Sequence, residues 1–336
     1  MKKIHQICVI GAGRIGRLHA QNICERADAQ LRCVVDINDA AAEQLAKELG
    51  ARWCSLDEAL NDAEIDAVVI ASSTDTHVNL IQAAARAGKA VFCEKPIDLD
   101  SEKVKACLNV VERCSTPLFV GFNRRFDPNF QQLHKAINDK SIGDLEMIQI
   151  TSRDPGPPPS DYIRVSGGLF RDMMIHDLDM ARWLLGEEPV EVYATGSCLV
   201  DSAIAEHGDI DSALVTLKTA SGKLCQISNS RRAAYGYDQR IEILGSQGMI
   251  QAENVSSSSV VIHDKHGIRR DLPPYFFLDR YHQAYKIEMN EFIDSLNGQP
   301  PKVTGIDGAK ALELADAAHR SFLQGRPVQM PPESEG

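Results

Sequence analysis

Along the first 120 residues, short apolar runs alternate with amphipathic stretches. The runs IHQICVI, QLRCVV, AVVI, AVFC and LFVG are rich in the apolar and β-branched residues that buried strands favour. Between them, stretches such as RIGRLHAQNICERA and DAAAEQLAKELG repeat apolar residues at helical spacing, and the second ends on Gly50, which suits a helix terminus. Because parallel strands require crossover helices, this alternation predicts a doubly wound parallel sheet.

The pattern changes after residue 123. A helical pattern at 127–139 and the strand pattern GDLEMIQITSRD lead into DPGPPPSDY. We expect that segment to lack regular structure, because proline has no backbone N–H and restricts the residue before it. From 190 to 271, strand patterns follow one another closely, with glycine and polar turns between them, which predicts an antiparallel sheet.

Two further helical patterns, at 279–297 and 305–324, close the chain. The whole pattern predicts two domains: a Rossmann dinucleotide-binding domain at 1–122 and an α+β substrate and oligomerisation domain at 123–336. The fold class is therefore α/β followed by α+β, and the last helices are free to pack back on the N-terminal domain. A length of 336 residues is ample for two cores.

Composition narrows the class of protein. The chain is 43% apolar and 25% charged, which is ordinary for a soluble globular protein. Its net charge of −11 argues against nucleic acid or an anionic membrane as a partner, because their phosphates would be repelled. The nine cysteines are odd in number and form no CxxC pair, and neither a signal peptide nor an apolar run of about 18 residues occurs. We therefore expect a cytoplasmic protein that acts on a small molecule.

One stretch, GGLFRDMMIHDLDMARWLLG at 167–186, predicts a single helix with an unusual polar face. Asp172, His176 and Asp179 stand at i, i+4 and i+7, so one narrow sector of that helix holds an imidazole between two carboxylates. Such a face is most often solvated surface, and a metal site or acid–base machinery are the other interpretations. A metal would need further ligands and no HExxH motif occurs, so we expect no metal.

The motif GAGRIG at residues 11–16 has the G-x-G-x-x-G form of a dinucleotide-binding turn. It follows an apolar run, opens a helical pattern, and precedes Asp36, which lies 20 residues past Gly16. Glycines let the backbone approach a pyrophosphate, and the helix N-terminus supplies N–H groups. A carboxylate at Asp36 repels a 2′-phosphate, so the sequence favours NAD over NADP, although Arg14 and Arg17 near the turn leave NADP open.

Two more polar segments follow predicted strands and should lie at the carboxyl edge of the sheet, where ligands bind. In SSTDTH at 72–77, we expect Thr74 and His77 near the nicotinamide ribose. In EKP at 94–96, Lys95 either points into the same crevice or is a simple exposed lysine, and spacing alone leaves both open. The candidate cofactor-binding residues are Gly11, Gly13, Arg14, Ile15, Gly16, Asp36, Ser72, Ser73, Thr74, His77, Glu94 and Lys95.

These motifs together resemble one family. The GxGxxG turn, Asp36, STDTH, EKP and the GGLFRDMMIHDLDMARWL helix are similar to the glucose–fructose oxidoreductase, inositol dehydrogenase and rhizopine-catabolism (Gfo/Idh/MocA) family. The resemblance runs over nearly the whole chain, down to DGAKALELADAAHRSFLQGRPV. SRDPGPPP and AAYGYDQR resemble the inositol 2-dehydrogenase branch in particular.

The resemblance implies a catalytic trio at Lys95, Asp172 and His176. It implies an NAD-dependent dehydrogenase that oxidises a secondary hydroxyl of a cyclitol. The oxidation of myo-inositol to 2-keto-myo-inositol is the reaction that the resemblance favours. His176 would be the base, because histidine exchanges protons near neutral pH. Lys95 would polarise the hydroxyl oxygen, and Asp172 would orient the imidazole. A homotetramer formed through an open antiparallel sheet is also implied. The implied substrate ligands are Arg125, Asp154, Asp179, Tyr235 and Tyr237, with the two tyrosines unranked.

Other functions stay open at this point. A polar site of Asp, Arg, His and Tyr would suit a sugar nearly as well as a cyclitol, so a scyllo-inositol, glucose or aldose dehydrogenase is an alternative. A non-catalytic NAD(P)-binding regulator is another, and the presence of Lys95, Asp172 and His176 argues against it.

Overall fold

The computed structural model describes residues 3–331, which divide into two compact units. Unit 1 comprises the described residues up to Phe126 together with Gln283–Lys310. Unit 2 comprises Asp127–His282 and the described residues from Ala311 onward. The last two helices, α11 (Phe277–Ser295) and α12 (Gly305–Gln324), therefore each contribute to both units.

Unit 1 is built on a six-stranded sheet in the order β3-β2-β1-β4-β5-β6, and every neighbouring pair is parallel. Its strands are β1 (His5–Ile10), β2 (Ala29–Val35), β3 (Arg52–Trp53), β4 (Ala67–Ile70), β5 (Ala90–Glu94) and β6 (Leu118–Gly121). The predicted doubly wound parallel sheet is confirmed. The strand order reverses between β1 and β4, which is the place where such sheets bind ligands.

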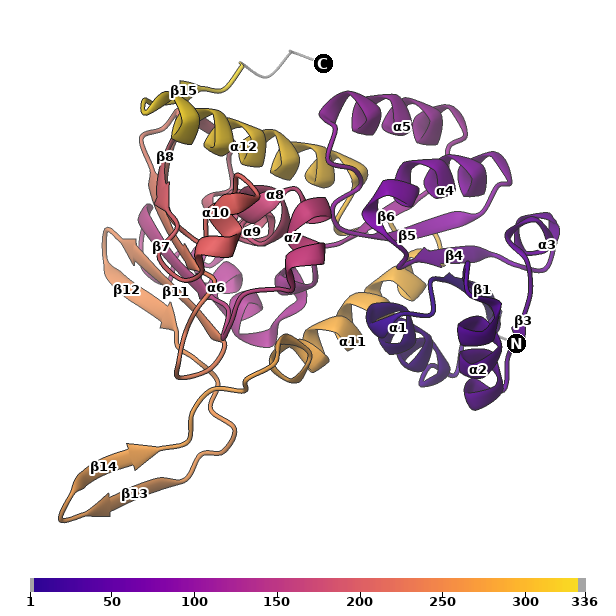
Figure 1. The fold of residues 1–336 in the computed structure, drawn as a ribbon, viewed down its shortest axis with the longest axis horizontal. Helices are drawn as coiled ribbons and strands as arrows, with labels where there is room; N and C mark the ends of the chain where they lie inside the picture. Colours follow the sequence, from indigo (N-terminus) through magenta and orange to yellow (C-terminus); the bar gives the residue numbers. More distant parts are fainter. Residues whose placement is uncertain (1–2, 332–336) are drawn as a thin grey trace. The chain divides into compact units, whose positions relative to one another are not determined.

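Helices join these strands: α1 (Arg14–Cys24), α2 (Asp39–Leu49), α3 (Leu56–Asn61), α4 (Thr74–Arg86) and α5 (Ser101–Arg113), and the 3₁₀ helix η1 (Asn123–Phe126) follows β6. Helices α4 and α5 lie on one side of the sheet and α1 and α2 on the other (Figure 1). Local chemistry sets their ends: the Asn38 side chain caps α2, which terminates at Gly50 in the left-handed conformation. The short β3 and α3 were not predicted from the apolar pattern.

Unit 2 contains a seven-stranded sheet in the order β12-β11-β7-β10-β9-β8-β15. The strands are β7 (Leu145–Arg153), β8 (Pro189–Ser197), β9 (Ser212–Thr219), β10 (Leu224–Ser230), β11 (Asp238–Gly245), β12 (Gly248–Ala252) and β15 (Val328–Gln329). All neighbours are antiparallel except β7 and β10, which are parallel, so the predicted antiparallel sheet is confirmed and gains one parallel pair where β7 joins it. The chain leaves β7 through helices and returns by the β8–β9–β10 meander, which brings β10 beside β7 in the same direction.

Helices pack against one face of this sheet. Along β9 the side chains alternate strictly, with Val215 and Leu217 buried and Leu214 and Thr216 exposed. Helices α6 (Pro128–Asn138) and α9 (Ile175–Leu185) pack against the sheet, and the Asn229 side chain on β10 donates a hydrogen bond to Asp177 of α9 at 3.0 Å. Side chains on the opposite face are exposed within the described part of the chain, as Gln149 on β7 and Gln226 on β10 show.

The remaining helices of unit 2 are α7 (Ser160–Ser166), α8 (Gly168–Asp172) and α10 (Ser202–Glu206). DPGPPPSDY was expected to be irregular throughout, but α7 begins at Ser160 directly after Pro159. A proline can precede a helix without costing it a hydrogen bond, because the first N–H groups of a helix have no intrahelical acceptor. A hairpin of β13 (Val261–Asp264) and β14 (Gly267–Arg270) projects from this unit (Figure 1).

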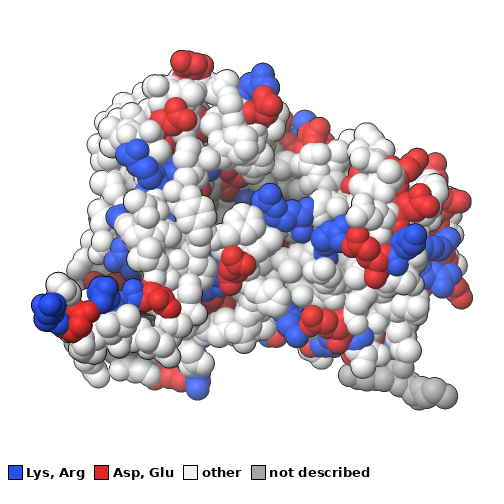
Figure 2. Space-filling view, turned by 60° about the horizontal axis from the view of Figure 1, so that its bottom comes forward, with Lys and Arg blue, Asp and Glu red and all other residues white. Residues whose placement is uncertain are grey.

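Two surface properties bear on possible partners. None of the described helices is both long and apolar enough to cross a bilayer. On the face drawn in Figure 2, the described Lys and Arg side chains are interspersed with Asp and Glu, and no continuous basic surface is seen there.

Candidate active site

The glycines of the turn between β1 and α1 have three different environments. A Cβ on Gly11, whose φ is +107°, would lie 2.5 Å from the Ala71 carbonyl oxygen, and a Cβ on Gly16 would lie 1.8 Å from the Gly11 oxygen. A Cβ on Gly13 would meet nothing within 4 Å. Gly11 and Gly16 are therefore required by the fold, whereas the open space at Gly13 fits a bound pyrophosphate at the N-terminus of α1.

Asp36 follows β2 and is anchored from both sides. Its Oδ2 accepts a hydrogen bond from the Ala12 N–H at 2.6 Å, and its Oδ1 accepts one from the Asn38 N–H at 2.8 Å. Each carboxylate oxygen keeps a lone pair for a ribose hydroxyl. Arg17, which could have served a 2′-phosphate, forms an ion pair with Glu48 on α2. These contacts fit NAD.

The segment 72–77 lies at the end of β4 and the start of α4, beside β1 and β5. The Ser72 and Thr76 hydroxyls are 2.7 Å apart. His77 is buried, with Nδ1 2.8 Å from the Pro96 carbonyl oxygen and Nε2 3.1 Å from that of Ser72. His77 therefore joins the 72–77 segment to the residue after Lys95, and a direct contact with the nicotinamide ribose stays a prediction.

Three predicted cofactor segments meet at one edge of unit 1. The glycine turn follows β1, 72–77 follows β4, and Glu94 and Lys95 stand at the end of β5, and these three strands are neighbours. Strand register places Ile10, Ile70 and Cys93 side by side at this edge. Lys95 is thus set at the carboxyl edge of the sheet, as expected of a residue in the ligand crevice.

In unit 2, the helix predicted for 167–186 is broken, so that prediction was wrong in one respect. Helix α8 ends at Asp172 and α9 begins at Ile175, with Met173 and Met174 between them. Both methionines are buried. The Leu169 carbonyl oxygen accepts hydrogen bonds from both the Met173 N–H at 3.1 Å and the Met174 N–H at 2.9 Å, and this shared acceptor interrupts the regular i→i−4 series. Asp172 and His176 consequently belong to different helices.

Asp172 is held by two donors that the sequence did not indicate. The Tyr162 hydroxyl donates to Oδ1 at 2.8 Å, and the Arg231 guanidinium donates to Oδ2 at 3.1 Å. Desolvation of the hydroxyl and the Asp172 carboxylate raise the pKa of Tyr162, so this hydroxyl remains a donor. Arg231 is buried and also lies 3.6 Å from Asp154, which brings two of the predicted site carboxylates together.

The other predicted substrate ligands are engaged with protein groups. Asp179 is buried 3.8 Å from Arg182, and Arg125 in unit 1 donates to Asp307 at 2.9 Å. The Tyr235 hydroxyl donates to Asp238 at 2.6 Å, whereas Tyr237 is buried. Their contacts with a substrate stay predictions. His176 lies in the first turn of α9.

Similarity to known proteins assigns the family. The oxidoreductase family with an NAD-binding Rossmann fold matches residues 5–122, and the GFO/IDH/MocA C-terminal domain matches residues 130–251. Inositol 2-dehydrogenase of Rhizobium meliloti (strain 1021) is 54% identical, over 96% of this chain and 98% of the relative. The chain belongs to the Gfo/Idh/MocA family. The resemblance inferred from the motifs is confirmed, and so is NAD as the cofactor of unit 1.

Two further similar proteins extend the comparison. Myo-inositol 2-dehydrogenase of Thermotoga maritima is 47% identical, over 97% of this chain and 98% of the relative. The crystal structure of scyllo-inositol dehydrogenase from Lactobacillus casei, with bound NAD(H) and scyllo-inositol, is 31% identical. It superposes with a TM-score of 0.90, over 97% of this chain and 99% of that chain.

Proposed function

We propose that this member of the Gfo/Idh/MocA family is an NAD-dependent inositol 2-dehydrogenase that oxidises myo-inositol to 2-keto-myo-inositol. The observation that carries the proposal is the presence of Lys95, Asp172 and His176 in a chain that matches inositol dehydrogenases along nearly its whole length. The polar surroundings of Asp172, with Tyr162, Arg231 and Asp154, suit an uncharged ligand rich in hydroxyls.

In this proposal, His176 takes the hydroxyl proton as general base, a role typically worth about 10² to 10⁴ in rate. The Lys95 ammonium donates to the same oxygen and stabilises the negative charge that develops on it. When bound, NAD accepts the hydride from the carbinol carbon. Asp172, which Tyr162 and Arg231 help to hold, accepts from a substrate hydroxyl or from the ammonium and so offsets that positive charge.

A substrate panel tests the proposal. Turnover is followed as absorbance at 340 nm with myo-, scyllo- and chiro-inositol and glucose, each with NAD and with NADP. We expect the highest kcat/KM for NAD with myo-inositol, and a His176→Ala enzyme that binds NADH normally but turns over slower by a few orders of magnitude. A preference for scyllo-inositol or glucose would assign another polyol dehydrogenase of the family. NADH binding with no reduction by any polyol would assign a non-catalytic regulator.

We further infer a homotetramer that assembles through the exposed face of the unit 2 sheet. Large apolar side chains stand exposed on this face from five strands, and a surface of this kind marks an interface. They are Met147, Tyr193, Leu214, Leu224 and Met249. Leu214→Glu should lower the mass measured by light scattering, while Leu323→Glu, on an exposed position of α12, should leave it unchanged. An unchanged mass for Leu214→Glu would argue against this face.

We also infer that the enzyme acts in the cytoplasm on a small polyol. All nine cysteines are free thiols in the structure, which suits a reducing compartment.

A further inference from the structure

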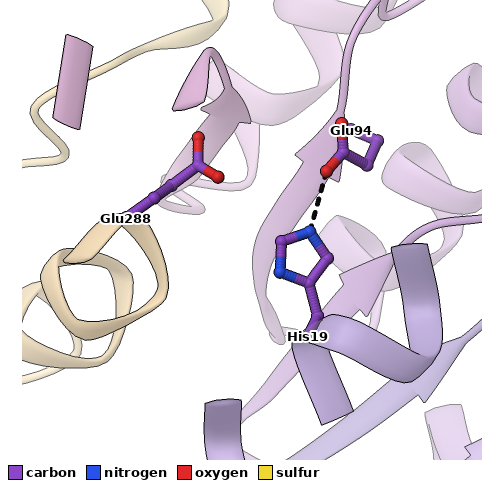
Figure 3. A group of neighbouring side chains, drawn as sticks. All are labelled: His19, Glu94 and Glu288. Atoms are coloured by element: carbon purple, nitrogen blue, oxygen red, sulfur yellow. Dashed lines mark hydrogen bonds and ion pairs between the residues drawn. The ribbon is translucent and has the colours of Figure 1, made fainter. Parts of the chain in front are cut away.

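A buried histidine and a partly buried glutamate meet directly before Lys95 in unit 1. His19 on α1 places Nε2 2.7 Å from Oε1 of Glu94, the last residue of β5 (Figure 3). The His19 side chain is fully buried and that of Glu94 is 13% exposed. Among the described residues, Nδ1 of His19 has no hydrogen-bond partner. A neutral His19 ring must therefore carry its proton on Nε2 and donate it to Glu94.

The Glu94 carboxylate is confined from the other side as well. Glu94 is the register partner of Gly121 on β6, and a Cβ at Gly121 would lie 3.1 Å from Glu94 Oε2. The His19 ring is itself fixed edge-on to Phe92 at 4.9 Å and to Tyr285 at 5.9 Å between ring centroids. Each group in this chain of contacts therefore has little freedom to move.

Lys95 thus stands between two anchored neighbours. His19 holds the Glu94 side chain on one side, and His77 contacts the Pro96 carbonyl oxygen at 2.8 Å on the other. We propose that His19 is a positioning residue which, through Glu94, fixes the backbone from which Lys95 reaches the substrate oxygen. This inference rests on the proposed function, because Lys95 has its role only in that reaction.

Glu288 on α11 completes the cluster, and it raises the alternative of a metal site. Its carboxylate is buried, points toward the His19–Glu94 pair (Figure 3), and has an oxygen within 4.8 Å of a ligand atom of each. Ligands that share a tetrahedral zinc ion at about 2.1 Å lie about 3.4 Å apart. The 2.7 Å separation between His19 and Glu94 is instead that of a charge-assisted hydrogen bond, which favours the positioning role.

The test compares His19→Leu, which removes the donor, with His19→Gln, whose amide can still donate to Glu94. Misplacing a reacting group by about 1 Å costs about 10² in rate. We therefore expect His19→Leu to lower kcat about 10- to 100-fold, with the KM for myo-inositol and the Kd for NADH within about threefold of the parent. His19→Gln should recover most of the loss. His282→Leu, at an exposed position, is the matched control and should behave as the parent.

Gly121→Ala provides an independent perturbation, because it displaces the Glu94 carboxylate without touching His19, and we expect the same loss of kcat. If His19→Leu fails to fold, this variant decides the matter. Turnover within twofold of the parent in the soluble variants would overturn the proposal, as would a loss of NADH binding equal to the loss of kcat. One bound metal ion per chain, lost on Glu288→Gln, would establish the metal site instead.

Lys95→Ala, measured alongside, separates two kinds of failure. If Lys95→Ala retains full turnover, the proposed role of Lys95 fails, and the inference about His19 fails with it. If Lys95→Ala is inactive while His19→Leu and Gly121→Ala are both fully active, the inference fails alone and the proposed function stands.

Discussion

Replacing Arg231 by methionine removes the cation that joins two carboxylates of unit 2. The Arg231 side chain is 3% exposed, donates to Asp172 at 3.1 Å and lies 3.6 Å from Asp154. A hydrogen bond to a charged group contributes about 1.5–3 kcal/mol, and leaving a fully buried charge unpaired costs about 3–5 kcal/mol. The Asp172 and Asp154 side chains are 12% and 23% exposed, so water compensates part of the loss. We expect unit 2 to lose about 2–3 kcal/mol of unfolding free energy.

Urea unfolding, followed by circular dichroism, measures this change, and activity at 340 nm measures its consequence. Arg232→Met is the matched control, because the side chain of this neighbouring arginine is exposed and its one described hydrogen bond is to the Leu199 carbonyl oxygen at 3.5 Å. Turnover should fall as well, since Asp172 then loses the Arg231 guanidinium that helps to hold it. A surface substitution usually changes the unfolding free energy by no more than about 0.5 kcal/mol. If the unfolding free energies of Arg231→Met and Arg232→Met differ by less than about 0.5 kcal/mol, this reasoning is refuted.

Three further predictions follow from separate features. Gly16→Ala should prevent unit 1 from folding, because its Cβ would meet the Gly11 oxygen, while Gly13→Ala should fold and bind NADH more weakly, as calorimetry would show. Asp36→Ser should lower kcat/KM for NAD about 10- to 100-fold, because one or two hydrogen bonds to a charged group are lost. An unchanged ratio of kcat/KM for NAD to kcat/KM for NADP would contradict this prediction. Burial raises the pKa of Asp211, but backbone N–H groups outweigh it and lower the pKa to about 2. Because the pKa of Asp211 in the folded state lies below the ordinary value near 3.9, the ionised carboxylate adds about 2 kcal/mol to the unfolding free energy above about pH 4. This contribution is lost as the pH falls toward 2. The unfolding free energy of Asp211→Asn, measured as a function of pH, should therefore lack this acid-dependent contribution.

Much of the fold was predictable because local pattern and fold agree in unit 1. Val68 and Val69 on β4 are both fully buried, as continuous apolar runs in parallel sheets require. The direction of β10 relative to β7 was not predictable, because alternation fixes which side chains are buried but not which strand lies beside which. The same holds for the interruption at Met173 and Met174, which lies inside a helical pattern that is continuous in the sequence.

Part of the candidate site escaped prediction for a related reason. The Asp36 carboxylate could be found because its distance from the glycine turn is fixed by one βαβ unit. Arg231 lies 59 residues beyond Asp172, at the end of another strand, and no spacing rule connects them. Tyr162 stands in a segment whose prolines indicated only irregular structure. Residues that hold a functional group in place can lie far from it in the sequence. They can be identified only when the pairing of the strands is known.

The break between α8 and α9 also changes how Asp172 can act. In one continuous helix, Asp172 and His176 would be neighbours at i and i+4, and the helix itself would align carboxylate and imidazole. Here Asp172 ends α8 and is held by Tyr162 and Arg231, which lie outside the predicted helix. Two side chains that helical spacing does not include therefore contribute to its orientation. Substitutions at Tyr162 or Arg231 should consequently affect the chemistry attributed to Asp172, although neither residue belongs to the trio.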